Sequence, residues 1–475
     1  MAKLDEISST EKLLKLIRNN QQSNVPEQDA ASNRKNWRKN FQFRIKKPLS
    51  FGKTVTVGID LGHDDLKLAK IEHASTQKHR LIDYLRIPYE PGLDLSNPEF
   101  PKFLKKHLNR FCRGAKSLEL WSTISSARVE LRYLRIPKVP PKQVANAVYW
   151  SHRKVAPFNE SESIFDFILL GEQVEDGVPK LGAVSFTVPR HEIQLHKELF
   201  AKSGYPLTGI SIIPFAIQNL FRARWIRDDV KTVSSLYIGR DWSRIDVYSR
   251  GNLVLSRGIK AGIKTMLEAM RGELSETEND NRITLPPELL EEAESSPKAL
   301  EIHRKFDTEK AQQIFFGLIH DSAAATGNRK ELQPEEEEIY QLILPALSRL
   351  VQQVERTFEH YTAHFGNEQV RKIYISSGIR PHRRIVDYIG DELGLPREIF
   401  DPFKTPPENL DDVDPPKAEI ERGAFTPAIG MGLSSNTATP NFLFTYKEKA
   451  RAARTRMLNK VAIVGFFLIL AGCLG

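Results

Sequence analysis

Residues 54–71 read TVTVGIDLGHDDLKLAKI, and this stretch decides the fold. Apolar residues alternate with small or polar ones on both sides of Gly62, which predicts two antiparallel strands joined by a short turn. The first strand carries Asp60 to that turn. A glycine there lets backbone N–H groups approach a phosphate, and an aspartate beside it can hold a water molecule on the magnesium ion of a nucleotide. A plain hairpin with a polar turn is the alternative, because so short a motif is common.

Later segments follow in an order that makes the hairpin more specific. They are residues 134–140 (LRIPKVP), 147–150 (AVYW), 154–158 (KVAPF), 165–167 (FDF), 204–206 (GYP), 212–216 (IIPFA), 252–258 (NLVLSRG), 370–378 (VRKIYISSG), 401–403 (DPF) and 428–433 (AIGMGL). Together with the hairpin, they resemble the PilM family, the actin-like cytoplasmic proteins of type IV pilus assembly. The resemblance covers residues 54–433. It implies an α/β, actin-like (ASKHA) fold of two lobes, with a small subdomain inserted at about residues 130–205.

The chain divides into four parts. Residues 1–50 combine a short predicted helix with a basic linker, and residues 51–435 form the PilM-type domain. Residues 436–460 hold an apolar motif followed by a basic segment, and residues 461–475 start a predicted transmembrane helix. A chain of 475 residues has room for two or three folding units. Since Cys112 and Cys473 are its only cysteines, the sequence predicts no disulfide framework.

Two features of the large domain follow from its patterning. Apolar residues from Leu347 to Phe365 recur at helical spacing, which predicts a core helix over residues 346–365 with Gly366 as its stop. Residues 272–334 are rich in charge and interrupted by proline and glycine, and they are too long for a plain connection. We expect them to form a variable helical insertion in the second lobe.

The net charge of +9 is concentrated at the two ends of the chain. Residues 1–47 hold eleven Lys or Arg against five acids, and residues 447–460 hold six against one, which leaves −2 for the body between them. A nucleic-acid-binding protein is expected to carry its basic surface on a folded face. The distribution therefore predicts a membrane as the partner of these ends, and no nucleic acid.

Residues 461–475 are apolar throughout and carry no charge. They are shorter than the roughly 20 residues that span a bilayer as a helix, so we expect the chain to be the front part of a longer protein. The basic residues 447–460 lie on the N-terminal side of this run, and positive charge favours the cytoplasmic side. The sequence therefore predicts an inner-membrane protein whose main domain is cytoplasmic. An apolar tail buried in the core is the alternative.

The apolar motif before the basic segment is Phe442, Leu443 and Phe444, flanked by Pro440 and Tyr446. It resembles the N-terminal peptide of PilN, the membrane partner whose cytoplasmic tip docks on PilM. The resemblance implies a natural fusion of the two proteins. We expect the three apolar side chains to dock between the inserted subdomain and the first lobe, either in cis or on a neighbouring copy. A generic juxtamembrane linker is the alternative.

The resemblance also implies where ATP and magnesium would bind. In the first turn, Asp60, Gly62 and Lys67 remain, but His63 stands where actin-like ATPases have Ser or Thr. The second turn offers Gly239, Arg240 and Asp241, with Tyr237 at the usual aspartate position and Trp242 where room is needed. The adenosine turn at Gly378 lacks the usual double glycine. These departures predict a degenerate ATPase site, and weak nucleotide binding stays open.

Other chemistry has little support in the sequence. The twelve histidines form no paired metal-ligand spacing, and no nucleophile elbow occurs. The resemblance therefore implies a membrane-anchored scaffold that couples a cytoplasmic motor to inner-membrane pilus alignment proteins. A GspL-like platform of type II secretion, an active actin-like ATPase and a sugar kinase on the same fold are the alternatives. Whether the chain forms a homo-oligomer stays open.

Overall fold

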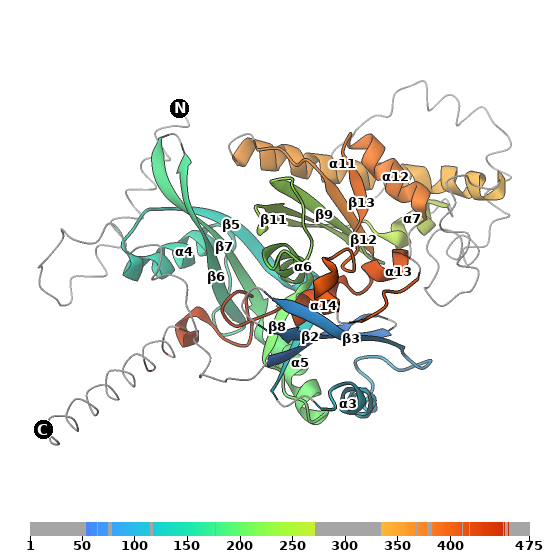
Figure 1. Cartoon of the computed structure of the whole chain (residues 1–475). Coiled ribbons are helices and arrows are strands. Elements are labelled where there is room, and N and C mark those ends of the chain that lie inside the picture. The colour runs from blue at the N-terminus through green and yellow to red at the C-terminus, as the bar shows by residue number, and fades with distance from the viewer. Residues whose placement is uncertain are drawn as a thin grey trace, which may run out of the picture. The chain divides into compact units, whose positions relative to one another are not determined.

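A computed structural model describes residues 54–63, 65–74, 78–114, 117–175, 177–270, 334–365, 368–377, 382–410, 412–417, 419–449, 451 and 455 (Figure 1). The chain splits into two compact units. Unit 1 comprises residues 1–219 and 427–475, and unit 2 comprises residues 220–426. The predicted N-terminal helix and basic linker, most of the insertion at 272–334, the turn at Gly378 and the apolar run 461–475 lie outside the described residues.

Unit 1 is built on a five-stranded sheet with the order β3-β2-β1-β4-β8. Its strands are β1 (Thr54–Leu61), β2 (Asp65–His73), β3 (His79–Pro88), β4 (Leu118–Ile124) and β8 (Gly209–Ile212). The first three strands pair antiparallel, and β1–β4 and β4–β8 pair parallel. The predicted hairpin is present as β1 and β2, with Asp60 directly opposite Lys67.

Helices cover both faces of this sheet. One face packs on α3 (Phe100–Phe111) and α5 (Arg190–Lys202). The other face packs on α6 (Ile213–Arg222) and α14 (Thr426–Gly432) through Trp121, Ala216 and Met431. Gly58 makes the close approach of α14 possible, because a Cβ there would lie 1.9 Å from the Ala428 carbonyl oxygen. A short 3₁₀ turn, η1 (Ser126–Arg128), follows β4.

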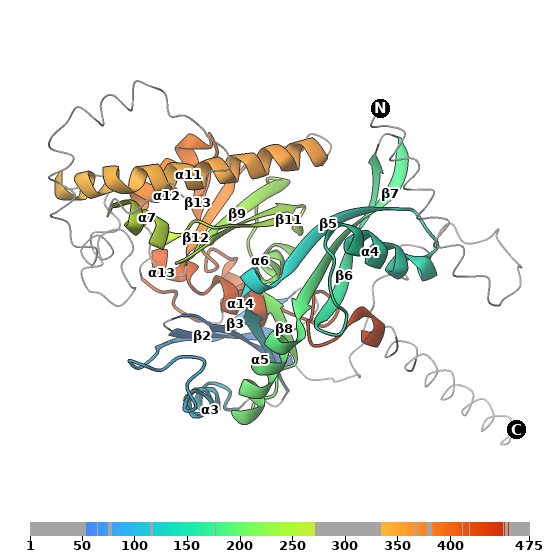
Figure 2. The ribbon, with the colours of Figure 1, turned by 180° about the vertical axis from the view of Figure 1, so that it is seen from behind.

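Between β4 and β8, the chain forms a second, smaller sheet. It has the order β5-β7-β6, with β5 (Glu130–Pro137), β6 (Ser163–Glu175) and β7 (Val178–Pro189) all antiparallel. Helix α4 (Pro141–Val155) lies on this sheet, as Figure 2 shows from behind. Val144, Ala147 and Val148 of α4 are fully buried against it.

Unit 2 repeats the sheet topology of unit 1. Its sheet has the order β11-β10-β9-β12-β13, with β9 (Thr232–Ile238), β10 (Ser243–Ser249), β11 (Asn252–Ile259), β12 (Ile373–Ser377) and β13 (Arg397–Ile399). The first three strands in chain order again pair antiparallel, and the last two add in parallel. Two units with one strand order and one set of strand directions are what a two-lobed actin-like fold requires.

The helices of unit 2 are α7 (Ile263–Met270), α11 (Pro334–His364), α12 (Arg383–Glu392) and α13 (Glu419–Gly423), with the 3₁₀ turn η3 (Pro407–Asn409). Helices α7, α11 and α12 share one apolar core with the sheet. Helix α11 begins 12 residues before the predicted helix did, and Pro345 lies inside it. The prediction was wrong at this end because proline removes only one helix hydrogen bond, while Ile339, Tyr340 and Ile343 before it are buried.

The described residues contain no helix that is both long and apolar enough to cross a membrane.

Candidate functional site

The first predicted turn joins β1 to β2 in unit 1, and its charged side chains are buried and bonded to neighbouring residues. The Asp60 carboxylate accepts a hydrogen bond from Thr123 Oγ1 at 3.0 Å, and its other oxygen lies 3.8 Å from Lys67 Nζ. Burial raises the pKa of the Asp60 carboxyl above its ordinary value, although Lys67 and Thr123 oppose the shift. Burial thus opposes the charged form of Asp60.

Lys67, one of the residues of the predicted nucleotide site, is paired with Asp65. Lys67 Nζ forms a short ion pair with Asp65, and the other Asp65 oxygen pairs with Arg86 Nε at 2.5 Å. Lys67 is 3% exposed. Burial disfavours the charged form of Asp65, but Lys67 and Arg86 outweigh it and lower the pKa of Asp65. The positive charge of Lys67 is therefore already neutralised inside the protein.

Gly62 and His63 complete this turn. The Gly62 N–H donates to the Asp65 carbonyl oxygen at 2.9 Å, so this N–H is occupied by the turn itself. A Cβ at Gly62 would lie 2.7 Å from Asp65 Oδ1, so only glycine fits beside that carboxylate. The His63 side chain is exposed. The structure thus brings Asp60, Gly62 and Lys67 together around Asp65, which the sequence prediction did not include.

The second predicted turn, in unit 2, joins β9 to β10. The Gly239 N–H donates to the Trp242 carbonyl oxygen at 3.0 Å, and the rings of Tyr237 and Trp242 are 6.1 Å apart. The Arg240 and Asp241 side chains are exposed. The backbone of this turn is therefore held tightly, while its two charged side chains face solvent.

The same turn supplies carbonyl oxygens to the start of α7. The Gly239 oxygen accepts from the Ile263 N–H at 3.1 Å, and the Arg240 oxygen accepts from the Lys264 N–H at 2.9 Å. First-turn N–H groups of a helix are the usual donors to an anion. Here both are used within unit 2. In each turn, the donors named above are thus bonded within their own unit and are not free for a phosphate of Mg-ATP. Gly378 follows β12 and lies outside the described residues.

The segment that contains Phe442, Leu443 and Phe444 docks on unit 1 of its own chain. The Phe442 N–H donates to the Ile210 carbonyl oxygen at 2.9 Å, and the Asn441 side chain accepts from the Ile210 N–H at 3.2 Å and donates to the Thr208 oxygen at 3.0 Å. These bonds cover β8, which is an edge strand of its sheet. Capping of this edge satisfies backbone groups that would otherwise be unpaired.

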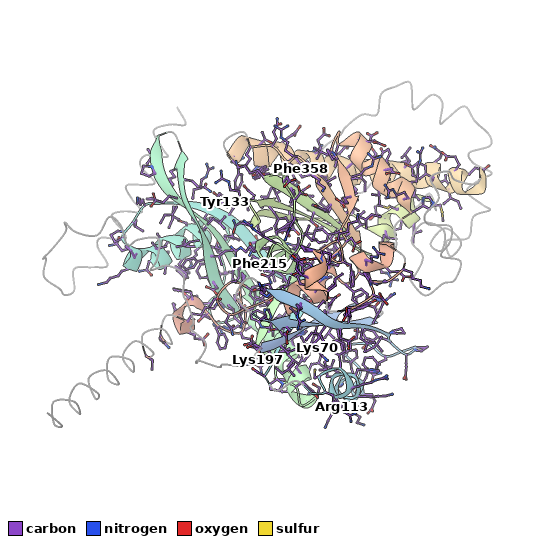
Figure 3. All side chains as sticks on the ribbon, viewed as in Figure 1. Lys70, Arg113, Tyr133, Lys197, Phe215 and Phe358 are labelled. Atoms are coloured by element: carbon purple, nitrogen blue, oxygen red, sulfur yellow. The ribbon has the colours of Figure 1, made fainter. Side chains whose placement is uncertain are left out.

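The Phe442 side chain is fully buried. Its ring centre lies 5.0 Å from that of Phe186 on β7 and 6.4 Å from that of Phe215 on α6, which Figure 3 labels. Phe442 therefore fills a gap between the inserted sheet and the helix that follows β8. Leu443 is half-buried. Phe444 differs from the expectation, because its side chain is 45% exposed.

A second part of the segment, from Tyr446 to Lys449, lies beyond the predicted site and packs on β6. The Tyr446 ring centre lies 5.6 Å from that of Phe165, and Lys449 pairs with the buried carboxylate of Asp166. Burial raises the pKa of the Asp166 carboxyl even with Lys449 beside it. Lys447 pairs with Glu160 at 3.0 Å. The pattern Phe165-Asp166-Phe167 was the available signal, since an acid between two aromatic residues suits a Tyr and Lys partner.

The described residues hold no group of three or more His, Cys, Asp or Glu side chains placed to bind a metal ion.

Comparison with known proteins supports the fold. No protein-family model matches the sequence, and no curated protein matches it. The PilM–PilN type IV pilus biogenesis complex is similar in structure at a TM-score of 0.56 and 18% identity, over 81% of this chain and 99% of that chain.

Two further solved structures show weaker likeness and carry no argument of their own. MreB5 of Spiroplasma citri bound to ADP has a TM-score of 0.37 at 13% identity, over 79% of this chain and 94% of that chain. The cytoplasmic domain of EpsL, an inner membrane component of the type II secretion system of Vibrio cholerae, has a TM-score of 0.29 at 12% identity, over 48% of this chain and 79% of that chain. The chain has an actin-like, two-lobed α/β fold, and its predicted resemblance to PilM is confirmed at the level of the fold.

Proposed function

We propose that the chain is a scaffold of type IV pilus assembly, held at the inner membrane with its actin-like domain in the cytoplasm. Its work is to couple an assembly motor to inner-membrane alignment proteins. The observation that carries the proposal is the docked segment. Phe442 and Lys449 tie the actin-like domain to the stretch that leads into the apolar run 461–475, within one polypeptide. Force or position at the membrane would thereby pass directly to the domain.

The proposed scaffold works without ATP hydrolysis. Lys67 is neutralised by Asp65, and the carbonyl oxygens of Gly239 and Arg240 occupy the first donors of α7. A turn whose N–H groups and charged side chains are bonded within the protein must break those bonds before it can bind a phosphate. Each buried donor or acceptor left without a hydrogen bond costs about 1–3 kcal/mol of free energy. An active ATPase would need both turns to reopen.

The function is tested by deletion of the gene in its source cell and complementation with variants. We expect deletion to abolish surface pili, measured as sheared pilin, and Phe442→Asp to fail to restore them. Phe444→Asp is the matched control, because Phe444 is exposed and its replacement leaves the docked segment intact. Immunoblots of membrane fractions confirm that both variants accumulate equally.

Two outcomes would contradict the proposal. Loss of exoprotein secretion with intact pili would assign the chain to a GspL-like platform of type II secretion. Normal pili and normal secretion after deletion would remove the scaffold from both systems.

A further inference from the structure

Helix α4 presents two faces of different character. Val144, Ala147 and Val148 are buried against the inserted sheet. Lys142, Asn146, Trp150 and Arg153 are exposed at spacings of three or four residues along one side of the helix. Pro141, Lys154 and Val155 are the other exposed positions, so four of the seven are basic or aromatic. The sequence of α4 contains no Asp or Glu.

Trp150 and Val155 are unusually exposed for apolar residues. Trp150 is 45% exposed and Val155 is 55% exposed. The Arg153 guanidinium lies 5.7 Å from the centre of the Trp150 ring, and its Nη1 donates to the Tyr149 hydroxyl at 3.2 Å. The exposed side of α4 therefore carries a large aromatic ring with Arg153 beside it, and two further cationic side chains, Lys142 and Lys154.

The nearest paired acid is already neutralised. The Glu160 carboxylate accepts a hydrogen bond from Lys447 Nζ at 3.0 Å and a short one from the Tyr149 hydroxyl. Lys138, which follows β5, pairs with Glu172 of β6 at 3.0 Å. Glu162 is a further exposed acid near this end of β6. The surface around the end of α4 thus keeps an excess of positive charge.

The chain itself places the C-terminal half of α4 close to the segment that leads to the predicted membrane helix. Lys447 Nζ lies 6.0 Å from the centre of the Tyr149 ring on α4. The apolar run begins at Val461, 12 residues after Lys449. Those residues reach about 18 Å as a helix and about 43 Å when fully extended. If the apolar run enters a bilayer, α4 cannot lie far from that bilayer.

We propose that the exposed face of α4 binds the anionic headgroups of the membrane and orients the actin-like domain on it. Trp is enriched at the membrane interface, and Lys and Arg close to the surface are attracted by anionic lipids. This inference rests on the proposed membrane attachment, but it assigns a second, peripheral contact that the apolar run does not provide.

Lysine acetylation of the full chain tests this contact. The protein is mixed with vesicles of phosphatidylcholine, with or without phosphatidylglycerol, and the reaction of each lysine is followed by mass spectrometry. We expect phosphatidylglycerol to slow the acetylation of Lys142 and Lys154 roughly fivefold or more. Lys197, an exposed residue of α5 that Figure 3 labels, belongs to the same unit and should react at the same rate in both.

Two matched variants show whether lysine protection depends on the exposed face of α4 or on any exposed apolar residue of unit 1. Trp150→Glu should remove the protection of Lys142 and Lys154. Leu195→Glu, which replaces another exposed apolar residue of unit 1, should keep it.

Each failure has a distinct reading. A chain that does not float with vesicles of either composition would overturn the proposed membrane attachment itself. A chain that floats while Lys142 and Lys154 react as Lys197 does would keep the attachment and overturn the α4 contact. Protection by duplex DNA, without protection by phosphatidylglycerol, would also overturn it and would identify a nucleic-acid surface.

Discussion

Replacement of Phe442 by alanine should release the docked segment without unfolding unit 1. The Phe442 side chain is fully buried between Phe186 and Phe215 when the segment is docked, and it is exposed when the segment leaves. Truncation of a buried Phe to Ala costs about 3–5 kcal/mol. In the undocked state the Phe442 side chain makes no packing contacts, so its truncation destabilises the docked state alone.

The size of the effect follows from that cost. A tenfold change in an equilibrium constant corresponds to about 1.4 kcal/mol. The undocked fraction should therefore rise roughly 150- to 4000-fold. Proteolysis follows the population of the open state when opening and closing are faster than cleavage. Trypsin cleavage after Lys447 and Lys449 should accelerate by the same factor until the docked state is no longer the major one.

The assay is limited trypsin digestion of the full chain, with cleavage sites read by mass spectrometry. Cleavage after Lys67, which is buried in β2, reports unfolding of unit 1 and should stay slow. Phe444→Ala is the matched control and should change cleavage little, because Phe444 is exposed. The reasoning is refuted if Phe442→Ala and Phe444→Ala are cut after Lys447 and Lys449 at the same rate.

Four further outcomes are expected. Asp65→Asn should lower the free energy of unfolding at neutral pH by about 3–5 kcal/mol in urea titrations, because it leaves Lys67 buried without its main partner; an exposed control, Asp83→Asn, should lower it little. Because the pKa of Asp65 is lowered in the folded state, the stability it contributes should be complete above its ordinary value of 3.8 and lost as the pH falls below it, and this part of the pH dependence should vanish in Asp65→Asn. Lys449→Ala should speed trypsin cleavage after Lys447, because it leaves the buried carboxylate of Asp166 without its ion-pair partner. Asp166→Asn in the double variant should restore slow cleavage, since the buried side chain is then neutral. Equal cleavage rates in the single and double variants would contradict the ion pair of Lys449 with Asp166. Calorimetry of the full chain with Mg-ATP should show no micromolar binding and no phosphate release, and turnover that Asp60→Ala abolishes would contradict the scaffold.

The hairpin and the later half of α11 were predictable because their signals are local. Alternation around Gly62 sets two strands, and the spacing of Leu347, Leu350 and Val354 sets one helical face. The first half of α11 was missed because Pro345 reads as a boundary. Proline lacks an N–H but leaves the rest of a helix intact, and only the core of unit 2 shows that Ile339 and Ile343 continue the buried face.

The buried charges of the first turn could not be predicted from the motif. Asp65 and Lys67 are two residues apart on one strand and so share a face, which was a signal present in the sequence. Arg86 is 21 residues from Asp65, and its pairing depends on the register of β2 with β3. Register is a property of the whole sheet.

Phe442 and Phe444 illustrate a different limit. Their spacing suggests one shared face if the segment were a strand. The segment instead turns after its two bonds to Ile210, so that Phe442 enters the core and Phe444 faces solvent. Which of two similar side chains is buried depends on the partner surface rather than on the segment.

The connection into the docked segment bears on whether the segment docks in cis or on a neighbouring copy. Ser434 and Thr439 both bond the buried side chain of Asn219 at 3.0 Å, and Asn441 bonds Ile210 and Thr208 on the edge of the sheet. Thr439 and Asn441 are two residues apart, so the chain between them reaches at most about 7 Å. A segment handed to a second copy would have to pull Thr439 away from Asn219 as well. The Asn219 oxygen would then lose a buried hydrogen bond, unless the second copy supplied its own Thr439 in exchange, at a cost of about 1–3 kcal/mol. The short path from Thr439 to Asn441 therefore favours docking in cis over a one-way transfer to a neighbouring copy.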